Sequence, residues 1–169
     1  MKTRRFHLAQ ANIARMRAPL EDPLLAGFAS QLDAINAAAD RSPGFVWRLQ
    51  TDAGNATAIR AFEDDLILFN MSVWESLEAL HHYVYRSEHV GPLRDRRQWF
   101  EPMSGPTLVL WWIPAGHLPT IEEAKERLRT LAMEGPTTNA FTFKVWYPPP
   151  GEEAAVDRKP EFEPCEWTT

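Results

Sequence analysis

The order in which strand-like and helix-like segments follow one another constrains the fold of this chain most. Apolar or alternating runs predict strands at 6–13, 45–50, 66–73, 107–113 and 141–146. Apolar residues at helical spacing predict a helix after Pro23, and capping-box patterns predict helices that begin at Ser72 and Thr120. A further short helix is predicted at 93–100. The β-α-β-β-α-β core within this order predicts an α+β, ferredoxin-like domain, with an antiparallel sheet and helices on one face.

The sheet face that the helices leave open has to be covered, and in such folds a second copy of the chain commonly covers it. Trp111 and Trp112 are neighbours on the predicted strand at 107–113, so alternation sends their side chains to opposite faces. One of them is expected to face the helices and the other to face a partner copy, because aromatic residues suit a dimer core. A homodimer is therefore expected.

Composition places the chain among ordinary globular proteins. Its 169 residues are 44% hydrophobic and 24% charged, which is typical of one domain. No apolar run approaches the roughly 18 residues of a membrane span, and 6–13 is too short for a signal segment, so a cytoplasmic protein without a membrane partner is expected. The sequence lacks the cluster of basic residues that would indicate a nucleic-acid partner, so none is expected. Residues 148–169 are proline-rich and carry six acids against two bases, which predicts a disordered acidic tail after a folded domain at 1–147.

Histidine and tyrosine side chains gather in the stretch from Val73 to Phe100. His81, Tyr85 and His89 lie four residues apart, so on a continuous helix they would share one face. Such a face could transfer protons, because neutral histidine titrates near working pH, or it could be an ordinary helix surface. Both interpretations fit the sequence.

Arginines in the same stretch could bind an anion or pair with acids on a solvated surface. Arg97 lies four residues after Leu93 and three before Phe100, on the predicted apolar face of the short helix, which favours it as an anion clamp. Arg94 and Arg96 are interpreted as solvated. HExxH order is absent, so no metal site is predicted. GxSxG, Walker A and GxGxxG motifs are absent too, so hydrolase, kinase and nucleotide-dependent dehydrogenase classes have no support.

Several short motifs together resemble a known family. They are Tyr85-Arg86-Ser87-x-His89, Leu93-Arg94-x-Arg96-Arg97-x-Trp99-Phe100, Trp111-Trp112-x-Pro114-Ala115-Gly116-His117 and Gly135-Pro136-x-x-x-Ala140-Phe141. With the rest of residues 6–146 they resemble a bacterial family of unknown function in the dimeric α/β-barrel superfamily, which includes antibiotic-biosynthesis and haem-degrading monooxygenases. The resemblance implies a homodimer with a pocket between the sheet and the helices of each copy. It also implies a monooxygenase-like oxidoreductase that acts on a small aromatic or hydrophobic molecule.

The resemblance also bears on the cofactor. Haem-degrading relatives use an asparagine on the first strand, a tryptophan on the second core helix and an axial histidine after it. Asn12 and Trp74 match the first two, but the segment 92–99 contains no histidine. A reaction without a cofactor is therefore expected, with haem as the alternative.

Residue types and the resemblance together give a predicted site. His89 or Tyr85 is the predicted catalytic proton-transfer group, and Arg97 is the predicted anion clamp. The other predicted substrate-binding residues are Asn12, which would orient a substrate oxygen, and Trp74, His81 and Trp111. Two further functions fit the same sequence: a small-molecule or haem-type binding protein without turnover, and a purely structural homodimer.

Overall fold

The computed structural model describes residues 5–51, 57, 59–86 and 96–152, and these contain one five-stranded antiparallel sheet. Its strands are β1 (Phe6–Met16), β2 (Phe45–Arg48), β3 (Ile67–Trp74), β4 (Phe100–Glu101) and β5 (Leu108–Pro114). The sheet runs in the order β2-β3-β1, and β4 and β5 pair with successive stretches of the free side of β1. With β5 as the fourth core strand, this is the ferredoxin-like order. The predicted fold class is confirmed.

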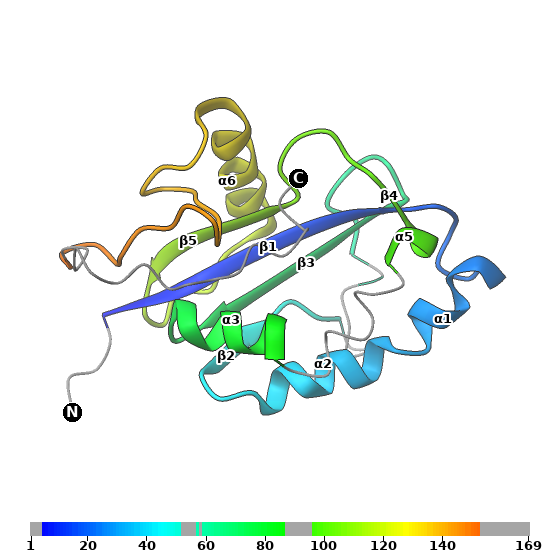
Figure 1. Cartoon of the computed structure of the whole chain (residues 1–169), viewed down its shortest axis with the longest axis horizontal. Helices are drawn as coiled ribbons and strands as arrows, with labels where there is room; N and C mark the ends of the chain where they lie inside the picture. The colour runs from blue at the N-terminus through cyan, green and yellow to red at the C-terminus, as the bar shows by residue number, and fades with distance from the viewer. Residues whose placement is uncertain (1–4, 52–56, 58, 87–95, 153–169) are drawn as a thin grey trace.

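Two longer helices lie on one side of this sheet and a third lies on the other (Figure 1). α2 and α3 follow β1 and β3 in the chain, as the ferredoxin-like pattern requires, and α6 follows β5. The helical elements are η1 (Pro23–Leu25), α1 (Ala26–Ala29), α2 (Leu32–Arg41), α3 (Leu77–Arg86), α5 (Arg96–Trp99) and α6 (Ile121–Glu134).

Alternation along the strands divides the interior into two cores. In the register of the sheet Ala9 lies between Val73 and Trp111, so odd-numbered residues of β1, β3 and β5 share one face. This odd-numbered face packs on α6 through Ala124 and Leu128. The even-numbered face, from Leu8 to Trp112, packs on α2 and α3. Strand periodicity therefore decides which side chains can meet which helix.

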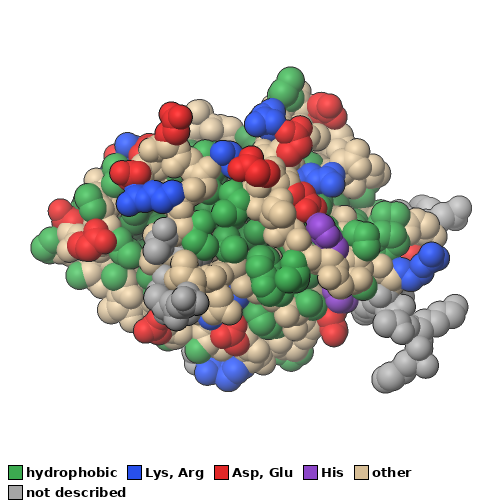
Figure 2. Space-filling view, turned by 180° about the vertical axis from the view of Figure 1, so that it is seen from behind, with side chains coloured by type: hydrophobic (Ala, Val, Ile, Leu, Met, Phe, Trp, Pro, Cys, Tyr) green, Lys and Arg blue, Asp and Glu red, His purple; other side chains and the backbone are tan. Residues whose placement is uncertain are grey.

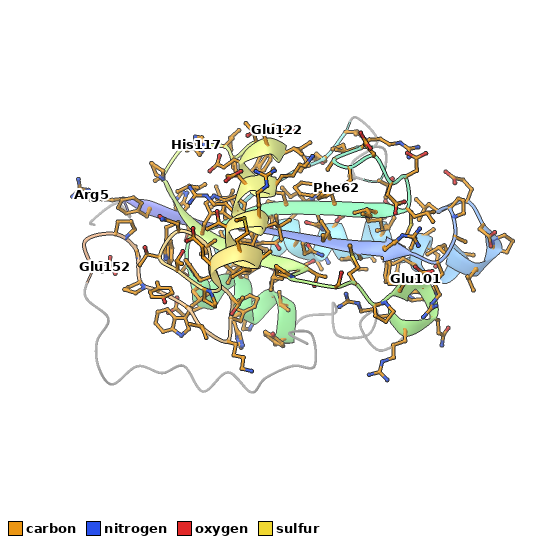
Figure 3. The ribbon with its side chains drawn as sticks, turned by 90° about the horizontal axis from the view of Figure 1, so that it is seen from above. Arg5, Phe62, Glu101, His117, Glu122 and Glu152 are labelled. Carbon is orange, nitrogen blue, oxygen red and sulfur yellow. The ribbon has the colours of Figure 1, made fainter. Side chains whose placement is uncertain are left out.

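The odd-numbered face is already covered within one chain. Phe69, Met71 and Val73 are at most 2% exposed, beneath α6 and the segment that contains Ala61 and Phe62. Figure 3 shows α6 lying across the strands, and the ammonium of Lys125 on α6 lies 4.9 Å from the centroid of the Phe62 ring. A partner copy that packed on this face would have to displace α6. The homodimer itself stays a prediction.

The helix that the sequence predicts to begin at Thr120 is α6, and both of its ends agree with the prediction. The Oγ1 of Thr120 accepts a hydrogen bond from the backbone N–H of Glu123 at 3.1 Å, which caps the first turn. Gly135 follows the last helical residue at φ 71°, a conformation that glycine adopts without strain.

The prediction that a helix begins at Ser72 was wrong. β3 continues to Trp74, and the Oγ of Ser76 accepts the cap hydrogen bond from the N–H of Ala79 at 3.1 Å. Ser72 pairs with Gln10 across the sheet and uses its hydroxyl for side-chain hydrogen bonds instead. Trp74 therefore ends a strand and does not open the helix.

The predicted strand at 141–146 was also wrong, since it shrinks to one bridge between Leu110 and Phe141. The chain turns at once, because the N–H of Val145 donates to the Oγ1 of Thr142 at 3.1 Å and the N–H of Thr142 donates to the carbonyl of Val145. Beyond this turn, residues 148–152 form neither helix nor strand, and 153–169 lie outside the described residues.

Charged side chains are mixed over the visible surface. Figure 2 shows hydrophobic side chains in the middle of one face, with acidic and basic side chains interspersed around them. No helix within the described part of the chain is long and apolar enough to span a bilayer.

Candidate functional site

A cavity of about 250 Å³ lies between the even-numbered face of the sheet and helices α2 and α3. Polar side chains of β1 and β3 form part of its floor beside the apolar Ala14 and Leu68 of the same strands, whereas its walls are mostly apolar and come mostly from the helices. The floor residues are Gln10, Asn12, Asn70, Ser72 and Trp74, and the wall residues include Phe28, Leu32, Ile35, Leu80, Val84, Phe100 and Phe143. A concave apolar site with a few convergent polar groups is the usual form of a small-molecule site.

The hydroxyl of Ser72 links three buried side chains on the floor. The Oγ of Ser72 accepts a hydrogen bond from the Nε2 of Gln10 and another from the indole Nε1 of Trp74, both at 2.8 Å. Gln10 and Ser72 are 8% and 6% exposed, and Trp74 is fully buried. The network fixes the positions of these three side chains, because leaving any of their donors unpaired at this depth would cost about 1–3 kcal/mol.

Two asparagines continue the polar floor beside this network. Asn12 and Asn70 face each other across β1 and β3, and the Oδ1 of Asn70 lies 3.4 Å from the Nε2 of Gln10. Asn12 is half-buried, and its side-chain amide makes no hydrogen bond to any described residue. Both amides can therefore donate N–H groups to an oxygen of a ligand in the cavity.

Tyrosines from α3 form the end of the cavity next to Trp74. The ring of Tyr83 stacks on Trp74 at 5.0 Å, and its hydroxyl donates to the carbonyl of Ile35 at 3.1 Å. Burial raises the pKa of Tyr83 well above its usual value, so this phenol stays protonated and does not act as a base. Tyr85 lines the cavity and packs on His81, with 4.3 Å between the ring centroids.

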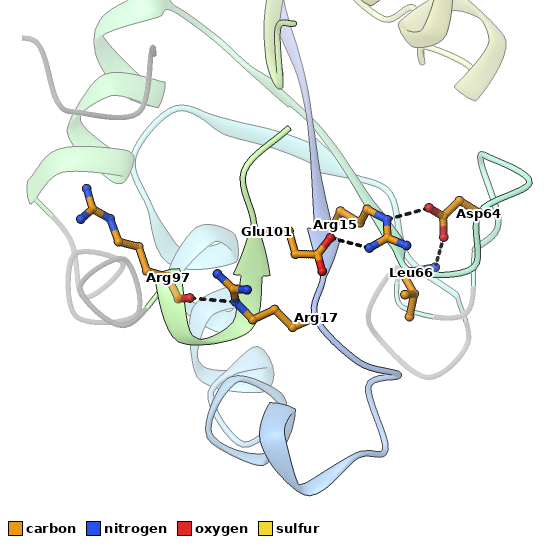
Figure 4. Close-up of polar contacts among 6 residues, drawn as sticks. All are labelled: Arg15, Arg17, Asp64, Leu66, Arg97 and Glu101. Atoms are coloured by element: carbon orange, nitrogen blue, oxygen red, sulfur yellow. Dashed lines mark hydrogen bonds and ion pairs between the residues drawn. The ribbon is translucent and has the colours of Figure 1, made fainter. Parts of the chain in front are cut away.

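Arg96, and not Arg97, is the arginine of α5 that lines the cavity. It is half-buried, and this burial lowers its pKa from the usual value, although a guanidinium remains charged. Arg97 is exposed, and its backbone carbonyl accepts a hydrogen bond from the Nε of Arg17 at 3.0 Å (Figure 4). The buried residue of α5 is Trp99, three positions after Arg96, so these two share the inward face.

The structure brings together some of the predicted site residues and separates others. Asn12, Trp74 and Tyr85 line the same cavity, and His81 packs behind Tyr85 without lining it. Arg97 and Trp111 lie elsewhere, and His89 is outside the described residues. Trp111 belongs to the odd-numbered face, where its Nε1 donates to the Oε1 of Glu123 at 3.0 Å.

Gln10, Asn70 and Ser72 are floor residues that the sequence interpretation missed. A signal for them exists, because polar residues recur at every second position of two strands: 10 and 12 in β1, and 70 and 72 in β3. An apolar strand with a polar stripe on its helix-facing side indicates a site and not only a core.

Glu123 joins two side chains on the far side of the sheet. Besides Trp111, it contacts the Nε2 of His117 through its Oε2 at 2.8 Å. Burial favours the neutral acid, but the hydrogen bonds from His117 and Trp111 outweigh it and hold the pKa of Glu123 below its usual value. The cluster ties the turn after β5 to the first turn of α6.

The pKa of Glu123 is lower in the folded state than in the unfolded state, where it is about 4.5. The stability that the ionised carboxylate adds is therefore fully present above the unfolded-state pKa and is lost as the pH falls through the folded-state pKa. Glu123→Gln is therefore expected to lose less stability than the native chain between pH 5 and pH 3, measured as melting temperature against pH. Glu122→Gln, the same change at an exposed neighbour, is the control and should keep the native pH profile. Identical acid profiles for all three proteins would contradict the prediction.

The lining residues that the structure describes do not fit haem. Haem iron usually takes an axial histidine, cysteine or methionine, less often a tyrosine. The described lining residues include none of the first three, and its two tyrosines are packed against Trp74 and His81. No cluster of three or more histidine, cysteine or carboxylate side chains suited to a metal occurs within the described ranges.

Comparisons with known proteins identify a family and two similar structures. Residues 7–158 match the family described as a domain of unknown function, DUF3291. Two crystal structures of SnoaB, a cofactor-independent oxygenase from Streptomyces nogalater, are similar in structure. One, of a mutant, has 16% sequence identity and a TM-score of 0.43, over 68% of this chain and 97% of that chain. The other has 17% identity and a TM-score of 0.41, over 66% and 95%. No curated protein matches the chain.

Proposed function

This chain belongs to the DUF3291 family of domains of unknown function, so we infer its activity from its own site. We propose that the cavity binds a small, mainly apolar molecule through an oxygen atom of that molecule. The observation that carries this proposal is the division of the cavity into apolar walls and a floor of hydrogen-bonding groups. Apolar walls favour an aromatic or hydrophobic body, and the floor orients it.

The charge of the lining favours an oxygen that is an anion or becomes one. Arg96 is a cation in the cavity wall, and the amides of Asn12 and Asn70 have N–H groups to donate. Donors fixed in place before a reaction stabilise the negative charge that develops during it, without a cost of reorganisation. A phenolate or enolate is the matching substrate group.

We extend the proposal to a monooxygenase-like reaction without a resident cofactor. An enolate or phenolate is electron-rich, so such a substrate can itself reduce oxygen. The substrate supplies two electrons and two protons, one oxygen atom of O₂ enters the substrate, and the other leaves as water. Tyr85 lines the cavity and is the described candidate for the proton transfer, and His89 remains the alternative from the sequence.

A second candidate function, binding without turnover, is favoured by one specific observation. The floor consists of amides, a hydroxyl and an indole, none of which titrates near neutral pH. Such a floor orients a ligand but does not take its proton. The homodimer and the cytoplasmic location expected from the sequence remain proposals alongside either function. A dimer can be tested by light scattering on a size-exclusion column.

Oxygen uptake and binding of 1,5-dihydroxynaphthalene, an electron-rich aromatic probe, test these proposals together. Asn12→Leu replaces the amide with an apolar group of the same branching and is expected to weaken binding about 10-fold or more, because a hydrogen bond to a charged group is lost. Asn139→Leu makes the same change at an exposed loop position and should bind like the native chain.

Each result separates the two functions. Binding with oxygen uptake supports the oxygenase, whereas binding without uptake supports the carrier. Absence of binding, or equal binding by Asn12→Leu and the native chain, would contradict the proposed site.

A further inference from the structure

The hydroxyl hydrogen of Ser72 has no acceptor among the described residues. A serine hydroxyl has two lone pairs and one hydrogen. Gln10 and Trp74 each donate to its oxygen at 2.8 Å, so both lone pairs are used. Ser72 makes no other hydrogen bond within the described part of the chain. The remaining group is the O–H, which can only donate.

Ser72 lines the cavity, so an acceptor for this O–H can lie there. Ser72 is 6% exposed and lines the floor, between Gln10 on β1 and Arg48 on β2 in the register of the sheet. The guanidinium of Arg48 is bound to Asp40 at 2.8 Å and offers no acceptor. The Oδ1 of Asn70 already faces the Nε2 of Gln10. The acceptor that the hydroxyl lacks can come from a molecule in the cavity.

We propose that Ser72 determines specificity in the cavity: its hydroxyl donates to an anionic oxygen of the ligand, an enolate or phenolate, and discriminates against a neutral oxygen such as that of an ether. The inference rests on the proposed function, since it names the substrate group that the cavity takes. Gln10 and Trp74 act through Ser72 and are positioning residues.

The physical basis is that the polar groups of the floor present hydrogen-bond donors to the cavity. Two hydrogen bonds donated to one oxygen polarise its O–H and strengthen the bond that this O–H donates. The amides of Asn12 and Asn70 add further donors on the same floor. A hydrogen bond to a charged acceptor is stronger than one to a neutral acceptor, so a site built of donors favours an anionic oxygen over a neutral one.

A matched pair of probes tests this on the intact native chain. 7-Hydroxycoumarin ionises near neutral pH and changes its absorption when it does, whereas 7-methoxycoumarin has the same rings and cannot ionise. The native chain is expected to bind the 7-hydroxycoumarin anion at least about 10-fold more tightly than 7-methoxycoumarin, and the pKa of the bound probe should fall.

Substitutions isolate the contribution of Ser72 from that of Arg96, which also favours an anion. Ser72→Ala is expected to reduce the preference for the anion about 10-fold and to return the pKa of the bound probe toward its solution value. Trp74→Phe removes the indole N–H together with one ring of the side chain, keeps Ser72, and should produce a smaller change in the same direction. Ser104→Ala, at an exposed loop position, is the matched control and should behave like the native chain.

The outcomes distinguish this inference from the function on which it rests. Equal affinity of the native chain for both coumarins would overturn the role of Ser72 and leave the cavity as a binding site. An unchanged anion preference in a folded Ser72→Ala variant would do the same. Ser72→Ala leaves two buried donors unpaired, so a chain that fails to fold is replaced by Trp74→Phe as the variant that separates Ser72 from Arg96, and the comparison on the native chain can overturn the inference without either variant. Failure of both coumarins to bind would contradict the proposed function itself.

Discussion

Replacing Gly44 with alanine is expected to lower the melting temperature by about 10 °C. Gly44 has a φ of 82°, and a Cβ at this position would lie 2.6 Å from the Cβ of Ala79 on α3. The left-handed backbone costs about 1–3 kcal/mol and the overlap about 1–3 kcal/mol more, and for a domain of this size each 1 kcal/mol is about 2–4 °C. Circular dichroism during thermal unfolding measures this loss of melting temperature.

Gly105 provides a matched control for this prediction. It has the same φ of 82°, but a Cβ there meets nothing within 4 Å, so Gly105→Ala should show the backbone cost alone. Combining Gly44→Ala with Ala79→Gly should recover the overlap part, which a double-mutant cycle measures. If both glycine variants lost the same stability, the close approach of β2 and α3 at Gly44 would be wrong.

Replacing Trp111 with alanine is expected to lower the free energy of unfolding by about 3–5 kcal/mol without changing the affinity of the cavity for a ligand. Trp111 is fully buried beneath α6 and donates to Glu123, on the opposite face of the sheet from the cavity. The loss therefore comes from a void in the odd-numbered core. Urea unfolding measures the stability, and titration with 7-hydroxycoumarin measures the affinity.

Trp74 is the matched comparison, because it is equally buried but lies on the cavity floor. Trp111→Phe and Trp74→Phe are milder changes that keep both chains folded. They are expected to lose similar stability, whereas only Trp74→Phe should alter binding. A weaker affinity in Trp111→Phe would mean that the two faces of the sheet communicate, and would restore Trp111 to the predicted site.

The sequence indicated several residues of the candidate site, but it could not indicate which of them meet in space. Asn12 and Tyr85 were recognisable as residue types suited to binding, and they do line one cavity. Leu93 and Phe100 predict that Arg97 lies on the inward face of the short helix, whereas Trp99 is the buried residue of α5 and brings Arg96 to the cavity. Alternation separates Trp111 from Trp112 without saying which face each one takes, so the sequence alone could not place Trp111 on the face opposite the cavity.

The sequence by itself determined the fold class and the local signals that build it. Periodicity of two and of 3.6 residues, together with the cap at Thr120, is a property of the chain alone, and it predicted the order of the elements. The tertiary structure decided everything that depends on which segments meet. It placed α6 over the odd-numbered face, and it paired Ser72 with Gln10, 62 residues away in the chain. A hydrogen bond of that span is set by strand register, which no local pattern encodes, and register is what turns a row of alternating polar residues into the floor of a cavity.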